Sequence, residues 1–191
     1  IDAGDVRLEC LYQNKDSSIG TVITHPHPIY GGSMYNNVVH DIVKAFSALN
    51  YTTLRFNFRG IGSSTGKHGE GIDERDDFFA AYQYLKSSRD DEMSIMPAGY
   101  SFGSNIIFHT LHRIHEKCGV IFVSPPVDAM DFNTDNDLSG HQFFIIIGEN
   151  DEYCSPASAE GLAKKLNADL VILPGIDHFY RGESDILQKE L

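Results

Sequence analysis

Short apolar runs alternate along this chain with longer segments in which apolar residues recur at helical spacing. The β-branched run at 20–24 is typical of a buried parallel strand, because both faces of such a strand are covered. Residues 6–11 alternate enough to predict an edge strand. In all, we predict strands over 6–11, 20–24, 51–56, 94–98, 119–123, 143–147 and 170–173.

Helices are predicted between these strands. Apolar residues recur every three or four positions in the first of them, at Val38, Val39, Ile42, Val43, Phe46 and Leu49. Further helices are expected over 73–85, from 105 onward, over 157–166 and over 183–191. This alternation predicts an α/β fold, a three-layer sandwich with a mostly parallel central sheet and helices on both faces. At 191 residues the chain has the length of one domain, which we expect to span 1–191.

One local conflict lies within the strand at 94–98. Pro97 has no N–H, so it would remove a ladder hydrogen bond from a strand that the pattern places at the centre of the sheet. We expect a bulge or a locally unpaired position there.

The same segment carries the most informative motif in the chain. Gly99, Ser101 and Gly103 form Gly-x-Ser-x-Gly, directly between an apolar strand and the apolar start of a helix. This context is typical of a nucleophile elbow, in which the strand ends abruptly and the serine stands in a strained turn. The pentamer alone is a weak signal, since glycine and serine are common in ordinary turns.

Two later strands end in residues that could complete a catalytic site. Asp151 follows the strand at 143–147, and His178 follows the strand at 170–173. The order Ser, acid, His is that of an α/β-hydrolase triad, and the carboxyl ends of parallel strands meet at one edge of the sheet. We predict Ser101 as nucleophile, His178 as general base and Asp151 as its orienting acid, with Glu149 and Glu152 as less favoured acids.

An oxyanion hole needs two N–H donors. The backbone of Phe102, directly after the nucleophile, is expected to supply one of them. The other is expected from the loop after the 20–24 strand, where the prolines have no N–H to offer. His27 is the first candidate, followed by Ile29 and Tyr30.

Composition limits the partners. The net charge of −12 argues against nucleic acid and anionic membrane surfaces, and no apolar run has the length of a membrane span. No charged-then-apolar signal sequence opens the chain. The chain has an odd number of cysteines: Cys10, Cys118 and Cys154. An odd number predicts free thiols in a reducing compartment. We therefore expect a cytoplasmic protein whose partner is a small-molecule acyl substrate, with a homo-oligomer left open.

No motif in the sequence supports a cofactor site. The glycine-rich segment 60–65 lacks the third glycine of a dinucleotide fingerprint, and 64–68 lacks the spacing of a phosphate loop. His109, His112 and His115 recur every three residues, yet no carboxylate or cysteine completes a metal site with them. We expect neither a cofactor nor a metal.

The motifs together resemble a known family. Segments 25–34, 54–60, 99–103, 148–152 and 174–179 are similar to those of the small, lidless branch of the α/β-hydrolase superfamily, close to dienelactone hydrolases and short-chain carboxylesterases. The resemblance covers nearly the whole chain. It implies an α/β-hydrolase fold without a cap domain, a Ser101–Asp151–His178 triad and an esterase-like activity. Dienelactone hydrolases proper carry cysteine at the elbow, and the presence of Ser101 argues against that specific activity.

The predicted function is hydrolysis of ester or thioester bonds through an acyl-enzyme. Too few residues separate the strands at 119–123 and 143–147 for a cap, so an open site for small or exposed acyl groups is expected. Arg59 is expected to brace its loop, with binding of a substrate carboxylate as the less favoured alternative. Aromatic residues that could line the cleft or serve in packing are Tyr30, Tyr100, Tyr153 and Phe179. A serine peptidase and a non-enzymatic binding protein on the same fold are the alternatives.

Overall fold

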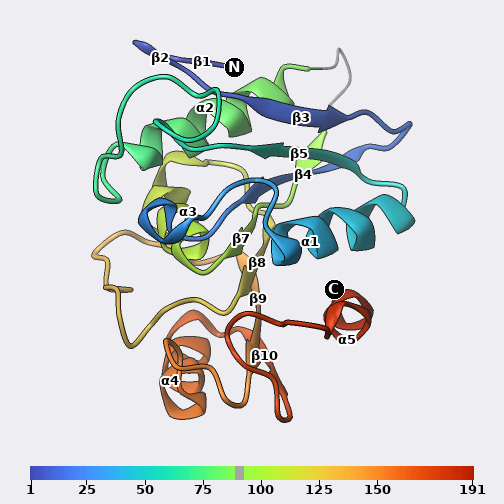
Figure 1. Cartoon of the computed structure of the whole chain (residues 1–191), viewed down its shortest axis with the longest axis vertical. Helices are drawn as coiled ribbons and strands as arrows, with labels where there is room; N and C mark the ends of the chain where they lie inside the picture. Colours follow the sequence, from blue (N-terminus) through green and yellow to red (C-terminus); the bar gives the residue numbers. More distant parts are fainter. Residues whose placement is uncertain (89–92) are drawn as a thin grey trace.

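The computed structural model describes residues 1–88 and 93–191. Their central feature is an eight-stranded sheet with the order β10-β9-β8-β7-β4-β5-β3, to which β6 is added as a partner of β4. Figure 1 shows this sheet running through the molecule with helices on both sides. The strands are β3 (Cys10–Gln13), β4 (Ile19–Thr24), β5 (Thr52–Phe56), β6 (Ser94–Ile95), β7 (Ala98–Tyr100), β8 (Gly119–Val123), β9 (Gln142–Gly148) and β10 (Asp169–Leu173).

All pairings in the sheet are parallel except that of β3 with β5. The predicted α/β sandwich with a mostly parallel sheet is therefore confirmed. Because the strands are parallel, the loops that follow β4, β7, β9 and β10 all leave from the same edge of the sheet. Those are the loops to which the sequence assigns the candidate site.

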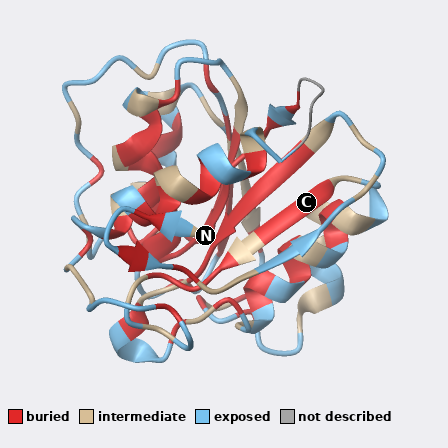
Figure 2. Cartoon of the chain, turned by 90° about the horizontal axis from the view of Figure 1, so that it is seen from above, coloured by how far each residue is buried: buried red, intermediate tan, exposed pale blue. Residues whose placement is uncertain are grey.

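Two hydrophobic cores lie on opposite faces of the sheet. Successive residues of a strand point to opposite faces, so Val22 belongs to one core and Ile23 to the other. The first core is covered by α2 (Glu74–Lys86), α3 (Phe102–Thr110) and α4 (Pro156–Leu166). The second is covered by α1 (Asn37–Ala48) and α5 (Ser184–Glu190). Figure 2 shows buried residues concentrated along the strands and on the inner sides of the helices.

The N-terminal edge differs from its prediction. Instead of one strand over 6–11, the chain forms a small hairpin of β1 (Asp2–Ala3) and β2 (Val6–Arg7), and the edge strand is β3. The break falls at Leu8 and Glu9. There the N–H of Leu8 donates to the carbonyl of Ile1 (2.8 Å), and the N–H of Glu9 donates to Ser64 Oγ (2.9 Å). These bonds to residues outside the sheet leave no ladder for a continuous strand.

Pro97 divides its strand as expected. β6 ends at Ile95 and β7 begins at Ala98, so the missing N–H falls between two short strands. The carbonyl of Pro97 still accepts a hydrogen bond from the N–H of Ile121 (2.9 Å), which keeps this segment tied to β8. None of the helices formed by the described residues is both long and apolar enough to cross a membrane.

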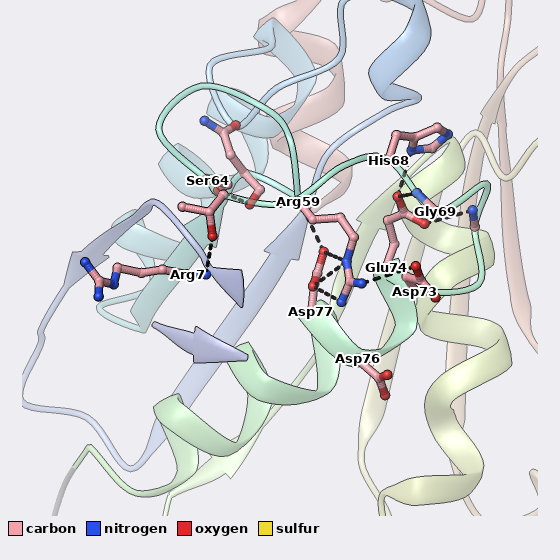
Figure 3. A network of polar contacts seen from close by, with 12 residues as sticks. Arg7, Arg59, Ser64, His68, Gly69, Asp73, Glu74, Asp76 and Asp77 are labelled. Carbon is pink, nitrogen blue, oxygen red and sulfur yellow. Dashed lines mark hydrogen bonds and ion pairs between the residues drawn. The ribbon is translucent and has the colours of Figure 1, made fainter. Parts of the chain in front are cut away.

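A polar network holds the long loop between β5 and α2 (Figure 3). Arg59 donates from Nε and Nη2 to the fully buried Asp77 carboxylate, with an Nη2–Oδ1 distance of 2.7 Å. Arg59 thus braces this loop, as its sequence position predicted. Glu74, also fully buried, accepts hydrogen bonds from the N–H groups of Gly69 (2.7 Å) and Gly71 (2.8 Å).

Neighbouring carboxylates in this network should differ sharply in their effect on stability. Asp77→Ala leaves the Arg59 guanidinium, only 11% exposed, without its buried partner, and should lower the free energy of unfolding by about 3–5 kcal/mol. Asp76→Ala, the control, removes a 65% exposed carboxylate paired with Arg113 and should cost less than about 1 kcal/mol. Urea unfolding of both variants tests this expectation. Equal losses would contradict it.

Candidate active site

Ser101 stands in a strained turn between β7 and α3. Its backbone has φ 52° and ψ −121°, a conformation that residues with a side chain rarely adopt. Although Ser101 occupies the N-cap position of α3, its hydroxyl makes no capping hydrogen bond. The N–H of Ser101 donates to the carbonyl of Val123 at 2.9 Å, which fixes the turn against the end of β8. The hydroxyl is therefore held at the sheet edge and available to another group.

The two glycines of the motif are required by close backbone contacts. A Cβ at position 99 would lie 2.6 Å from the backbone nitrogen of Ser104. A Cβ at position 103 would lie 2.8 Å from the carbonyl carbon of Thr24. Real Cβ atoms do not approach backbone atoms this closely, so only glycine lets α3 begin directly against β4 and β7. The local chain path of the predicted nucleophile elbow is present.

The structure brings the three predicted catalytic residues together. Nε2 of His178 lies 3.0 Å from Oγ of Ser101, and Nδ1 of His178 lies 2.9 Å from each oxygen of Asp151. A carboxylate can only accept, so Nδ1 carries a proton and Nε2 is left to accept from the serine hydroxyl. All three residues are less than 10% exposed: Ser101 7%, His178 4% and Asp151 6%.

Asp151 is oriented by the turn that follows β9. Its Oδ1 atom accepts the N–H groups of Tyr153 (2.9 Å) and Cys154 (3.0 Å) in addition to the bond with His178. The two less favoured acids lie elsewhere. Glu149 accepts the N–H of Gly175 at 2.8 Å, and Glu152 is exposed. Asp151 is thus the carboxylate that the fold places against the histidine.

The His178 loop is fixed by residues from distant parts of the chain. Oδ1 of Asp177 accepts the N–H groups of Phe179 (2.9 Å) and Tyr180 (3.1 Å), which forms a tight turn. Asn37, at the start of α1, donates from Nδ2 to the carbonyl of Phe179 (2.9 Å). Neither Asp177 nor Asn37 was among the predicted site residues. The position of Asp177, directly before the histidine, was the one local signal for its role.

Tyr100, predicted to bind substrate, is among the residues that line the cavity and also contacts the histidine loop. Its side chain is only 2% exposed, and its hydroxyl donates to the carbonyl of His178 at 2.9 Å. The centroids of the two rings lie 5.5 Å apart, with an angle of 32° between the ring planes. Burial raises the pKa of Tyr100 well above its usual value, so the phenol remains a donor. The residue supports the histidine loop from beneath the cavity.

The loop after β4 presents backbone donors near Ser101. The N–H of Ile29 donates to Nδ1 of His27 (3.3 Å), and that of Tyr30 donates to the carbonyl of His27 (3.1 Å). Both alternative oxyanion donors are therefore engaged. Within the described residues, the N–H groups of His27 and Phe102 have no acceptor in the protein. The structure leaves free the two donors that the sequence analysis placed first.

His25 anchors this loop from within the core. It is fully buried, its Nε2 accepts the N–H of Phe58 (3.1 Å), and its Nδ1 donates to the carbonyl of Pro26 (2.7 Å). Burial lowers the pKa of His25 from 6.5 to about 4, which keeps the ring neutral. The neutral ring joins the ends of β4 and β5 just before the donor at His27.

A cavity of about 710 Å³ opens over Ser101. Three predicted substrate residues line it with exposed rings: Tyr30 (85% exposed), Tyr153 (42%) and Phe179 (37%). Segment 124–141, between β8 and β9, contributes Pro126, Ala129 and Met130 to the wall and contains no helix or strand. Among the described residues, no group of three or more His, Cys, Asp or Glu side chains is arranged to hold a metal ion.

Comparison with known proteins agrees with this geometry. A family model described as serine aminopeptidase, S33, matches residues 29–136. An uncharacterized protein of Rickettsia prowazekii is 32% identical, with an alignment that covers 97% of this chain and 82% of the relative. The chain belongs to this family of the α/β-hydrolase superfamily. That assignment confirms the superfamily to which the sequence motifs pointed.

The chain is also similar to several solved structures of α/β hydrolases. An α/β serine hydrolase homologue from Coxiella burnetii has a TM-score of 0.87 at 29% identity, with 95% of this chain and 88% of that chain covered. A protein of unknown function from Agrobacterium tumefaciens has a TM-score of 0.88 at 34% identity, with coverages of 96% and 87%. A serine hydrolase without lid from Xanthomonas campestris has a TM-score of 0.85 at 26% identity, with coverages of 96% and 85%. The fold is that of lidless α/β serine hydrolases.

The buried neutral His25 should make the protein sensitive to acid. Below pH 6.5 the unfolded chain binds a proton at His25 that the folded chain does not bind until about pH 4, so stability falls as pH falls through this window. A shift from 6.5 to about 4 corresponds to roughly 3 kcal/mol. His25→Gln keeps a donor and an acceptor, and should remove this part of the pH dependence.

Urea unfolding of wild type and His25→Gln between about pH 7 and about pH 4.5 measures the difference. His112→Gln, at an exposed position, is the control and should follow the wild type. Equal losses of stability in wild type and His25→Gln would contradict the assignment of a neutral His25.

Proposed function

We propose that this chain is a serine hydrolase that cleaves small carboxylic esters or thioesters through an acyl-enzyme on Ser101. The observation that carries the proposal is the continuous hydrogen-bonded chain Ser101 Oγ, His178 Nε2, His178 Nδ1, Asp151 at the floor of an open cavity. Serine alone is a weak nucleophile at neutral pH, and an adjacent base oriented by a carboxylate is what activates it.

The first half of the reaction forms the acyl-enzyme. Oγ of Ser101 attacks the acyl carbon while its proton passes to Nε2 of His178, and the carbonyl oxygen becomes an oxyanion. The free N–H groups of Phe102 and His27 stabilise that charge. The bond from carbon to the leaving oxygen or sulfur then breaks, and His178 returns the proton to the leaving group. Asp151 stabilises the imidazolium throughout.

Water completes the cycle. His178 takes a proton from water, the resulting hydroxide adds to the acyl carbon, and the bond to Ser101 Oγ breaks as the proton returns to the serine. The products are the free acid and the unmodified enzyme. Segment 124–141 contains no helix or strand and forms only part of the cavity wall. The open cavity supports substrates with small or exposed acyl groups.

The lining of the cavity favours esters over aminopeptidase substrates. An aminopeptidase must bind a positively charged α-amino group, which needs a carboxylate or several acceptors once it leaves water. None of the described residues that line the cavity is Asp or Glu, whereas Arg181 and His27 are among them. The peptidase alternative, suggested by the description of the family model, therefore ranks second.

We also propose that the protein works in a reducing compartment such as the cytoplasm. Cys10, Cys118 and Cys154 are all free. Burial raises the pKa of Cys118 to about 11 and that of Cys154 to about 12. Thiols with such a high pKa carry little thiolate at neutral pH, so they are suited to a structural rather than a reactive role.

Replacement of the nucleophile should abolish esterase activity. We expect wild type to hydrolyse p-nitrophenyl acetate, and Ser101→Ala to lower kcat/KM at least about a thousandfold because no acyl-enzyme can form. Ser87→Ala, at an exposed position of α2's C-terminal end, is the control and should match wild type. Cleavage of aminoacyl p-nitroanilides with no cleavage of esters would favour the peptidase instead.

A further inference from the structure

The ring of His178 is flanked by two aromatic side chains that face the cavity. Tyr153 lies 4.7 Å from it between ring centroids at 57°, and Phe179 lies 5.5 Å from it at 87°. Both line the cavity and are about two-fifths exposed, at 42% and 37%. Tyr100, the third ring beside His178, is buried. Tyr153 and Phe179 are thus the aromatic surfaces that a substrate beside the histidine would meet.

Both residues are held by their backbones. The N–H of Tyr153 donates to Asp151 and its carbonyl accepts from Asp128 (3.0 Å). The N–H of Phe179 donates to Asp177, and its carbonyl accepts from Asn37. The backbone under each ring is therefore fixed before substrate binds, which lowers the ordering cost of a contact.

Phe179 has a further contact that orders its ring. The guanidinium of Arg181 lies over this ring, 5.1 Å from its centroid, in cation–π geometry. The ring is thus packed between Arg181 on its face and the imidazole of His178 in an edge arrangement. These contacts order the ring of Phe179, which forms part of the cavity wall, before substrate binds.

The chemistry decides which part of a substrate meets this wall. His178 delivers its proton to the leaving oxygen, so that oxygen must lie at Nε2 and its substituent beside the imidazole ring. The oxyanion loop also lines the cavity, but there Tyr30 packs against His27, with ring centroids 5.2 Å apart, and not against His178. The alcohol part of an ester is therefore the part placed against Tyr153 and Phe179.

We propose that Tyr153 and Phe179 form a subsite for the alcohol part of the substrate, and that this subsite selects flat aromatic alcohols, as in aryl and arylmethyl esters. This inference rests on the proposed serine esterase function. Aromatic rings prefer tilted and edge-to-face neighbours, and two rings that stand on a fixed backbone at different angles to His178 offer such contacts to a third ring. Each aromatic contact contributes about a two- to tenfold preference.

The test compares phenyl acetate with hexafluoroisopropyl acetate, whose alcohols are of similar acidity. Each kcat/KM is divided by the rate constant for alkaline hydrolysis of the same ester, which removes the difference in intrinsic reactivity. Wild type should favour the phenyl ester about tenfold, and Tyr153→Leu and Phe179→Leu should each reduce that ratio about threefold or more. Leucine keeps apolar bulk, so the change isolates the flat ring.

Two further variants locate the effect. Tyr84→Leu is the matched control, since Tyr84 is 41% exposed on α2 and packs against Tyr12, and it should leave the ratio unchanged. Tyr30→Leu alters a cavity ring that packs against His27 instead of His178, and should also leave the leaving-group ratio unchanged. A thermal melt of each variant confirms that it folds.

Three results would overturn the inference. The first is a wild-type ratio near one, and the second is a ratio that falls as much in Tyr30→Leu as in Tyr153→Leu. The third is an aromatic preference confined to the acyl part, seen when methyl phenylacetate is compared with methyl hexanoate. Hydrolysis of both acetates without preference would leave the proposed esterase function standing. No hydrolysis of any ester would overturn that function and the subsite with it.

Discussion

The strained turn at Ser101 is the constraint on which the rest of the site depends. A serine with φ 52° costs about 1–3 kcal/mol, and it persists only where the surroundings determine it. Here β4, β7, β8 and α3 do so, through the contacts that exclude a Cβ at Gly99 and Gly103 and through the bond from Ser101 N–H to Val123. The parallel sheet is therefore the device that holds a hydroxyl where a base can reach it.

The loops around this turn are fixed by polar groups, buried or half-buried, that have hydrogen-bond partners. His25 joins the ends of β4 and β5, Tyr100 supports the carbonyl of His178, and Asp177 closes the turn after it. Such groups are costly to bury unless they are hydrogen-bonded, and each of these is. The result is an arrangement set before substrate arrives, as electrostatic stabilisation of an oxyanion requires.

Periodicity and turn chemistry are local properties, which is why the order of strands and helices and a local interruption of the ladder at Pro97 could be predicted from the sequence. The meeting of Ser101 with His178 also followed, because parallel strands bring their ends to one edge. The hydrogen bond from the Tyr100 hydroxyl to the carbonyl of His178 could not be predicted, because no motif or turn signal marks a side-chain contact with a loop backbone. The edge strand was misplaced because bonds of Leu8 and Glu9 to distant residues decide where it begins.

We propose that His178 activates Ser101 and no other nucleophile. The most direct measurement is peptide mapping by mass spectrometry after reaction of the folded protein with a fluorophosphonate. We expect a single adduct, on the peptide that contains Ser101, and its loss in His178→Ala, because the hydroxyl loses its base. An adduct on another residue, or undiminished labelling of Ser101 in His178→Ala, would contradict the account.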